Sequence, residues 1–243
     1  MSLTAVAVPG LPEVREGDDL AALIAARAEL RSGDVLVLAH KVVSKAEGRV
    51  VRLADVTPGA QAVALAAQLG KDPAQMEVVL RETAEIVRAE RGVIVSRTHH
   101  GFVCANAGVD ASNAAADGEL VLLPADPDAS ARALRAALPG RPAVVITDSF
   151  GRAWRHGQVD VAIGIAGLAP LEDWRGRDDA RGRELSATWI AVADEAAAAA
   201  DLVRTKDGGL PAVILRGLER HVTPDDGPGA RELLRSRDED LFR

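Results

Sequence analysis

Residues 143–166 carry the clearest fold signal in this chain, and their sequence is AVVITDSFGRAWRHGQVDVAIGIA. Residues 143–147 form a short apolar run rich in β-branched side chains, which predicts a buried strand. Residues 159–165 alternate apolar with polar or small side chains, as a half-exposed strand does. The polar stretch between them, DSFGRAWRHGQ, is predicted to be a loop. This part of the chain is therefore expected to contribute two strands to a sheet.

Helices and strands alternate irregularly on both sides of this stretch. The hydrophobic spacing predicts strands at residues 34–40, 119–123 and 211–217, a β-hairpin at 93–96 and 102–105, and helices at 18–31, 72–90, 128–138 and 190–203. HKVVSKAEGR, at residues 40–49, is predicted to be a strand end followed by a loop. Because the order is irregular and includes a hairpin, we expect an α+β, mixed α/β fold rather than a regular doubly wound sheet.

One domain is assigned to residues 1–218, because no repeat or linker divides that part of the chain. Residues 219–243 are charged and punctuated by proline and glycine. They are predicted to form a surface tail with one short helix near residues 231–235.

The composition excludes several classes of function. The 243 residues carry 29 basic and 36 acidic side chains, a formal charge of −7, which argues against nucleic acid and membrane surfaces as partners. Cys104 is the single cysteine, so an internal disulfide and every multi-cysteine zinc site are excluded. Neither a secretory signal nor an apolar run long enough for a membrane span is present. We therefore expect a cytoplasmic protein with a small-molecule partner.

Two lysines stand out in a chain that otherwise uses arginine. The common phosphate-binding loop, dinucleotide, zinc-protease and serine-hydrolase motifs are all missing from the sequence. Lys41 and Lys45 are two of only four lysines, and a compact ammonium suits contact with a phosphate. The alternative is that both lie in a solvated loop.

Polar groups that suit an anionic substrate and its counter-ion follow the predicted strands. Asp110 follows the hairpin, and Asp148 and Ser149 follow the buried strand at 143–147. Two carboxylates on separate loops could hold a hard divalent cation together with phosphate oxygens. Arg152 and Arg155 could grip an anion through their guanidinium groups. The alternatives are turn or helix-cap roles for the aspartates and ordinary surface positions for the arginines.

Five stretches taken together resemble the coenzyme F420-0:L-glutamate ligase family. Their order and gaps match over about residues 8–216, and the long stretch after residue 146 is the most specific. The stretches are GLPEV at 10–14, HKVVSKAEGR at 40–49, AGVDASN at 107–113, ITDSFGRAWRHGQVDVAIGIAGL at 146–168 and DWRGRDDARGREL at 173–185. The chain ends before the flavin-binding domain that actinobacterial relatives carry, so the resemblance implies a stand-alone ligase without FMN.

The resemblance implies a GTP-dependent enzyme with the family's own α/β fold and an intertwined homodimer. Its substrates would be L-glutamate and coenzyme F420-0, whose lactyl-phosphate carboxylate would be activated as an acyl phosphate. Further glutamates would follow through γ-linkages. The implied cofactor is a divalent metal, Mg²⁺ or Mn²⁺, with K⁺ as an additional candidate.

The resemblance also assigns roles to particular residues. Those implied to contact the nucleotide are Leu11, Pro12, Glu13, Val14, His40, Lys45, Asn113 and Lys206. The implied metal ligands are Asp110, Asp148 and Ser149, of which the two aspartates, with Lys45, are the implied catalytic residues. Arg152, Arg155 and Arg175 are the implied substrate anchors. The relatives usually have Ser where this chain has His40, so this nucleotide contact is a departure from the family pattern.

Two other classes of function stay open at this point. A metal-dependent phosphohydrolase could use Asp110 and Asp148 to activate water. A non-catalytic nucleotide-binding subunit would bind GTP without turnover.

Overall fold

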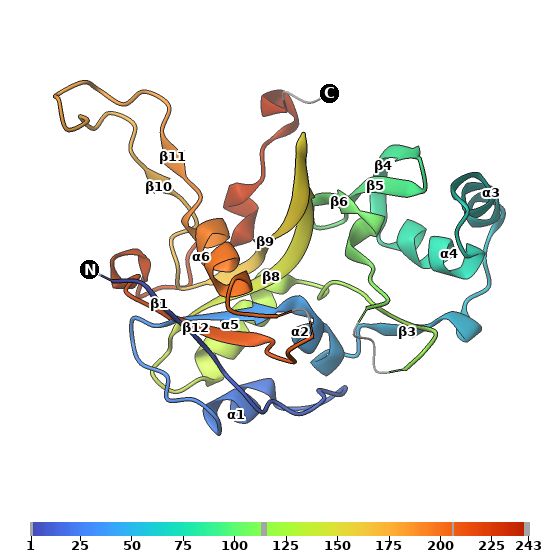
Figure 1. Ribbon diagram of the computed structural model, residues 1–243, viewed down its shortest axis with the longest axis horizontal. Helices are drawn as coiled ribbons and strands as arrows, with labels where there is room; N and C mark the ends of the chain where they lie inside the picture. The colour runs from blue at the N-terminus through green and yellow to red at the C-terminus, as the bar shows by residue number, and fades with distance from the viewer. Residues whose placement is uncertain (1, 113–115, 206, 241–243) are drawn as a thin grey trace.

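Five strands form the central sheet of the protein, in the spatial order β1-β12-β2-β8-β9 (Figure 1). The computed structural model describes residues 2–112, 116–205 and 207–240. The strand bounds are β1 Thr4–Ala7, β12 Ala212–Arg216, β2 Val35–Ala39, β8 Ala143–Arg152 and β9 Arg155–Ala166. β2 and β8 run parallel, whereas the other neighbouring pairs are antiparallel. The central sheet is therefore mixed.

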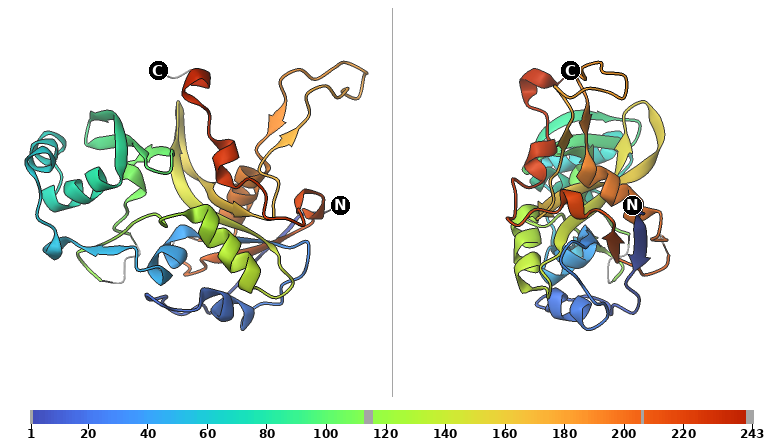
Figure 2. Two further views of the ribbon diagram at one scale, coloured as in Figure 1. Left: turned by 180° about the vertical axis from the view of Figure 1, so that it is seen from behind. Right: turned by 90° about the vertical axis from the view of Figure 1, so that its left-hand side faces the viewer.

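Helices cover both faces of the central sheet (Figures 1 and 2). α1 (Leu20–Ala25) and α5 (Pro127–Ala137) bury their apolar sides against one face. α6 (Val192–Asp201) packs its alanines against the other face, and their small side chains let helix and sheet approach closely. Burial from both sides explains why β2 and the first half of β8 are continuous apolar runs.

A second region lies beside the central sheet and has its own apolar core (right in Figure 1). β3 pairs with β7, and β4, β5 and β6 form a three-stranded sheet. Met76, Ile94 and Leu120 are fully buried in this core. The bounds are β3 Val50–Arg52, α3 Ala60–Leu69, α4 Pro73–Arg81, β4 Thr83–Glu90, β5 Val93–Thr98, β6 Val103–Ala105 and β7 Glu119–Val121.

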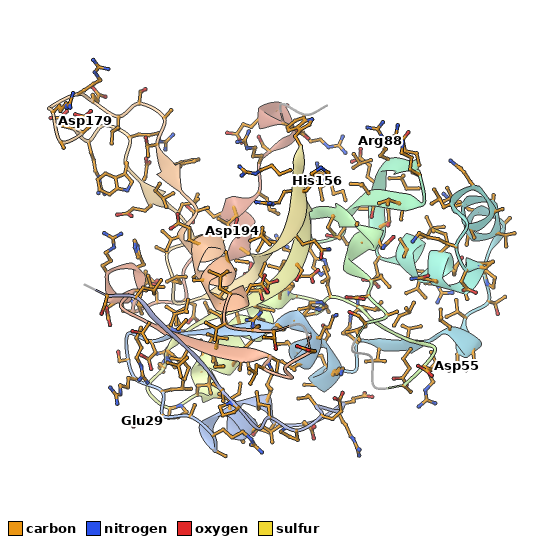
Figure 3. All side chains as sticks on the ribbon, in the orientation of Figure 1. Glu29, Asp55, Arg88, His156, Asp179 and Asp194 are labelled. Atoms are coloured by element: carbon orange, nitrogen blue, oxygen red, sulfur yellow. The ribbon has the colours of Figure 1, made fainter. Side chains whose placement is uncertain are left out.

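Residues 172–190, here called the arm, project from the body of the protein (upper left in Figure 1). The base of the arm is the pair β10 (Glu172–Asp173) and β11 (Trp189–Ile190), and Asp179 lies toward its far end (Figure 3). After β12 the chain returns to the sheet, where Ala230 is buried. The 3-10 turns are η1 Leu53–Asp55, η2 Asn106–Gly108, η3 Glu219–His221, η4 Ala230–Leu233 and η5 Arg237–Glu239.

Most of the predicted elements are present. The mixed α/β class is confirmed, and so is the hairpin, which is made by β5 and β6. Strands β2, β7 and β12 and helices α5 and α6 match predicted elements, whereas α1 ends at Ala25 rather than near residue 31. The short helix expected near residues 231–235 is the 3-10 turn η4. Within the described ranges, no helix combines the length and apolarity needed to span a membrane.

The loop predicted at residues 40–49 is wrong, because α2 (His40–Ala46) begins directly after β2. Val42 and Val43 disfavour a helix by intrinsic propensity. Both are buried in the main core, and the gain from burying them outweighs that small penalty. As a consequence, the two lysines of this segment lie one helical turn apart.

The helix predicted over residues 72–90 is also wrong in its second half. α4 ends at Arg81, and the residues from Thr83 onward form β4, paired with β5. Arg91 and Gly92 both have positive φ, 51° and 76°, as a two-residue hairpin turn of type I′ requires. Gly92 therefore belongs to the turn of a hairpin. Pairing with β5 makes residues 83–90 a strand rather than a helix.

The loop predicted at residues 148–158 is a third error. β8 and β9 continue through it as one long hairpin, in which Arg152 pairs with Arg155. Its tip is exposed, with Trp154 83% exposed and His156 near the end of the hairpin (Figure 3). Polar composition here indicates a solvated hairpin end rather than irregular structure.

Gly164 is expected to be required for stability. A Cβ at this position would lie 2.4 Å from the backbone carbonyl oxygen of Pro127, where α5 begins. Gly164→Ala is therefore expected to lower the free energy of unfolding by about 3 kcal/mol, because backbone on both sides must move. Gly151→Ala is the matched control, because a Cβ there meets no atom within 4 Å. Equal urea midpoints for the two variants would contradict this prediction.

Candidate active site

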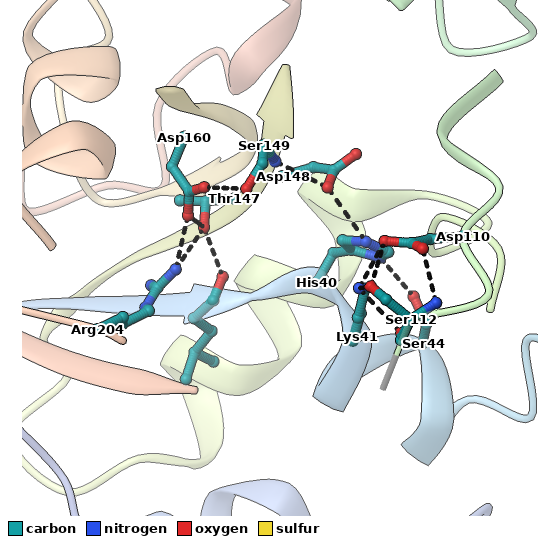
Figure 4. Close-up of polar contacts among 11 residues, drawn as sticks. His40, Lys41, Ser44, Asp110, Ser112, Thr147, Asp148, Ser149, Asp160 and Arg204 are labelled. Carbon is teal, nitrogen blue, oxygen red and sulfur yellow. Dashed lines mark hydrogen bonds and ion pairs between the residues drawn. The ribbon is translucent and has the colours of Figure 1, made fainter. Parts of the chain in front are cut away.

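The site is built where β2 ends beside the middle of β8, which runs on to Arg152. Because these strands are parallel and Ala39 is opposite Thr147, the residues after β2 meet the second half of β8 at this edge of the sheet. His40, the first residue of α2, lies with its Nε2 3.4 Å from Oδ1 of Asp148 (Figure 4). His40 is almost fully buried, and its Nδ1 is 3.2 Å from the Ser44 hydroxyl. The imidazole of His40 therefore lies between the Ser44 hydroxyl and the Asp148 carboxylate.

Asp110 reaches the same edge from the second region. Asn106 and Ala107 both adopt positive φ, 52° and 53°, an unfavourable conformation that turns the chain toward Asp110. Lys41 Nζ donates to Asp110 Oδ2 at 2.6 Å and to the Ser112 hydroxyl at 2.7 Å. Ser112 in turn donates its backbone N–H to Asp110 Oδ1 at 2.7 Å. Asp110 is thus held as a carboxylate next to a lysine cation.

Lys41 is expected to control the ionisation of Asp110. Burial raises the pKa of this carboxyl, but hydrogen bonds from Lys41 and Ser112 outweigh burial and hold the pKa below its ordinary value of 3.8. A carboxyl whose pKa is lowered by folding stabilises the protein at pH values above its ordinary pKa. This stabilisation is lost as pH falls through the pKa of the folded state. Lys41→Met is therefore expected to raise the pKa of Asp110, as measured by carboxyl NMR. It should also lower the melting temperature at neutral pH, by an amount that shrinks below about pH 4. An unchanged Asp110 titration would contradict this.

Lys45 lies one turn further along α2 and pairs with Glu13. The Lys45 side chain is buried, whereas the Glu13 side chain is largely exposed. The segment that carries Glu13 follows β1, and of its neighbours Val14 is buried and Pro12 exposed, with Leu11 between them in exposure. The structure therefore brings together the predicted segment at 11–14 and Lys45.

A buried polar cluster beside Ser149 was not predicted from the sequence. Asp160 on β9 is opposite Ser149 on β8 and accepts from its hydroxyl at 2.6 Å (Figure 4). The other oxygen of Asp160 accepts from Thr147 at 2.9 Å and from Arg204 at 2.7 Å. Asp160 stands in the sequence only as the polar position of an alternating strand, and Arg204 follows α6. The alternating pattern predicts that Asp160 is exposed, whereas the structure buries it in an ion pair with Arg204.

The donor types at this edge are those that a hard divalent cation prefers. Asp110 and Asp148 supply carboxylate oxygens and Ser149 a hydroxyl oxygen, ligand types that Mg²⁺ and Mn²⁺ prefer. Both carboxylates lie against α2, at Lys41 and at His40 respectively. Among the described residues, no three His, Cys, Asp or Glu side chains are grouped as a complete cage. A cation held here would complete its shell with water and phosphate oxygens.

The predicted substrate arginines lie away from this edge. Arg152 and Arg155 are exposed near the tip of the β8–β9 hairpin, where Arg152 donates to the His156 carbonyl at 2.6 Å. Arg175 lies on the arm, paired with Asp173 at 2.7 Å and stacked 3.9 Å from the Trp189 ring. None of the three contacts the carboxylates in the described structure.

Two predicted nucleotide contacts, Asn113 and Lys206, lie outside the described residues. Cys104 is buried as expected, and burial together with the nearby charge of Asp148 raises the pKa of its thiol to about 12. The thiol is therefore protonated at neutral pH and unsuited to act as a nucleophile.

Comparison with known proteins identifies the family of this chain. The chain matches the F420-0:Gamma-glutamyl ligase family over residues 10–217. It belongs to this family. Among its relatives are proteins named coenzyme F420:L-glutamate ligase from Methanothermobacter thermautotrophicus, at 46% identity over all of both chains, and from Methanopyrus kandleri, at 49% identity over 97% of this chain and 96% of the relative. The relative of that name from Halobacterium salinarum is 45% identical over 98% of this chain and 95% of its own.

The resemblance seen in the sequence motifs is thereby confirmed. The match to the F420-0:Gamma-glutamyl ligase family spans every element from α1 to β12, which includes four of the five central strands, the second region and the arm. Asp110, Asp148, Ser149 and Lys45 all lie within it.

Proposed function

We propose that this protein joins L-glutamate to coenzyme F420-0 in a GTP-dependent reaction. The membership of the chain in the F420-0:Gamma-glutamyl ligase family supports this most strongly, together with relatives of full length that carry the ligase name. The edge that gathers Asp110, Asp148 and Lys45 would be the active site. Addition of further glutamates through γ-linkages belongs to the same proposal.

The reaction needs an activated carboxyl group, because a carboxylate has a poor leaving group. A carboxylate oxygen of F420-0 would attack the γ-phosphorus of GTP, the bond to the β-phosphate oxygen would break, and GDP would leave. The amine of L-glutamate would then attack the acyl carbon and displace inorganic phosphate. Both steps bring anions together, so positioning and charge neutralisation are the main tasks of the protein.

The residues at the sheet edge suit these tasks. Lys45 carries a buried ammonium that would neutralise phosphate charge, and Glu13 is its counter-ion in the protein. Asp110, Asp148 and Ser149 would hold a divalent cation, which, when bound, withdraws charge from the phosphate oxygens. Lys41 holds the Asp110 carboxylate in place from α2, and the His40 imidazole lies against the Asp148 carboxylate. The exposed arginines of the hairpin tip and the arm lie away from this edge, and their proposed role is to contact acidic parts of the substrate outside it.

A requirement for both substrates distinguishes this proposal from its alternatives. Phosphate release from GTP is expected only when F420-0 and L-glutamate are both present. Release with neither present would favour a phosphohydrolase, and GTP binding without any turnover would favour a regulatory subunit.

A homodimer is also part of this proposal. The hairpin tip and the arm extend from the body and expose Trp154 and Trp189, of which 83% and 51% are accessible. Large exposed aromatic side chains are typical of interfaces. Light scattering at micromolar concentration is expected to give twice the mass of one chain, and a fully active monomer would contradict this.

A further inference from the structure

Asp160 is the centre of a buried polar cluster that touches one predicted metal ligand. Its side chain is 5% exposed, and that of Arg204, its ion-pair partner, is 8% exposed. One carboxylate oxygen accepts from Ser149 at 2.6 Å, and the other accepts from Thr147 at 2.9 Å and from Arg204 at 2.7 Å. Burial at this depth is costly for a charge, and these hydrogen bonds offset part of that cost for the Asp160 carboxylate.

The contact with Ser149 fixes the direction of one hydrogen atom. A serine hydroxyl has a single hydrogen, and a carboxylate can only accept. The hydrogen of Ser149 is therefore directed at Asp160, and toward any cation the hydroxyl oxygen can act only through its lone pairs. Arg204 and Thr147 occupy the far oxygen of Asp160 and so hold the near oxygen toward Ser149 (Figure 4).

We infer that Asp160, held by Arg204, is a positioning residue that orients the Ser149 hydroxyl for a divalent cation. This inference rests on the proposed function, because that function makes Ser149 a metal ligand. Groups behind a ligand orient it and strengthen it as a donor, and their loss typically weakens metal binding by about 10–100-fold.

Asp160→Asn changes the polarity of this contact with little change in shape. An asparagine has one acceptor oxygen, and Arg204 requires an acceptor on its side of the cluster. The amide NH₂ would then face Ser149 and donate to it. The hydroxyl hydrogen of Ser149 would lose its acceptor on residue 160, and the hydroxyl would no longer be held with its lone pairs toward the cation.

The test is titration with Mn²⁺ alone, followed by the EPR signal of the free ion. Asp160→Asn is expected to weaken Mn²⁺ binding by about 10-fold or more, and to have no further effect in a Ser149→Ala background. Asp194→Asn is the matched control, since Asp194 on α6 also packs against β9 but accepts from the Ala162 N–H at 2.9 Å and, among the described residues, makes no hydrogen bond to the cluster. It is expected to bind Mn²⁺ like the wild type.

The possible results separate the positioning role of Asp160 from the metal site on which that role rests. Mn²⁺ binding that is lost in Asp148→Asn but unchanged in Asp160→Asn would overturn the positioning role alone. A further loss on adding Asp160→Asn to Ser149→Ala would also overturn it, because Asp160 would then act by another route. Wild-type protein that binds no Mn²⁺, or Asp148→Asn protein that binds it fully, would overturn the proposed metal site and this inference together.

A second variant covers the case in which the buried charge of Arg204 prevents Asp160→Asn from folding. Asp160→Asn combined with Arg204→Gln removes both charges, and the glutamine amide still donates to the asparagine oxygen. The double variant is expected to show the same weakened Mn²⁺ binding, and wild-type affinity would overturn the inference.

Discussion

Asp148→Asn is expected to lower kcat for glutamate ligation by about a thousandfold while leaving the protein folded. The carboxylate lies in the second half of β8 beside His40, and its proposed role is to hold the cation that neutralises the transferred phosphoryl group. Loss of such a contact removes several kcal/mol of transition-state stabilisation. Product formation is measured together with melting temperature, with and without Mn²⁺ and GTP. Wild-type protein should gain stability from both ligands by mass action, and the variant should gain little.

Asp126→Asn provides the comparison for a purely local role. Asp126 caps α5 by accepting from the Ala129 N–H at 3.0 Å, and asparagine makes the same cap. Asp148 also accepts locally, from the Ser149 N–H at 2.8 Å, so asparagine would serve equally well if that were its only task. Retained ligation and an undiminished Mn²⁺-dependent stability gain in Asp148→Asn would show a turn residue rather than a ligand.

Lys45→Met is expected to reduce kcat/KM for GTP by about a hundredfold. Methionine keeps most of the buried volume and removes the ammonium that would neutralise phosphate charge. Glu13 is largely exposed, so its lost partner should cost little stability. Lys71→Met is the control, since Lys71 follows α3 in the second region. Steady-state kinetics with GTP as the varied substrate measure the effect, and an equal kcat/KM in both variants would contradict it.

The main strands and the two carboxylates were predictable because their signals are local. β2 and the start of β8 are apolar runs, and Asp148 directly follows the apolar run of β8, level with the end of β2. Asp110 likewise follows the β5–β6 hairpin. Period and position alone therefore indicated where these strands and carboxylates lie, whereas the metal-ligand role of the carboxylates came from the family resemblance.

The remaining parts depend on contacts between distant segments. β4 becomes a strand because β5 pairs with it, and α2 becomes a helix because Val42 and Val43 are buried in the core. Asp160 and Arg204 are separated by 44 positions, and neither carries a local sign that it would be buried in an ion pair. Such a cluster emerges only once β9 and the end of α6 are placed side by side.

Mass spectrometry of the deazaflavin product tests the central claim most directly. Purified protein is incubated with F420-0, GTP, Mn²⁺ and ¹⁵N-labelled L-glutamate. The proposed function predicts a product heavier than F420-0 by one or more labelled glutamyl units, formed only with GTP and absent with Asp148→Asn. Unmodified F420-0 after incubation with the wild-type protein, or labelled product formed without GTP, would contradict it.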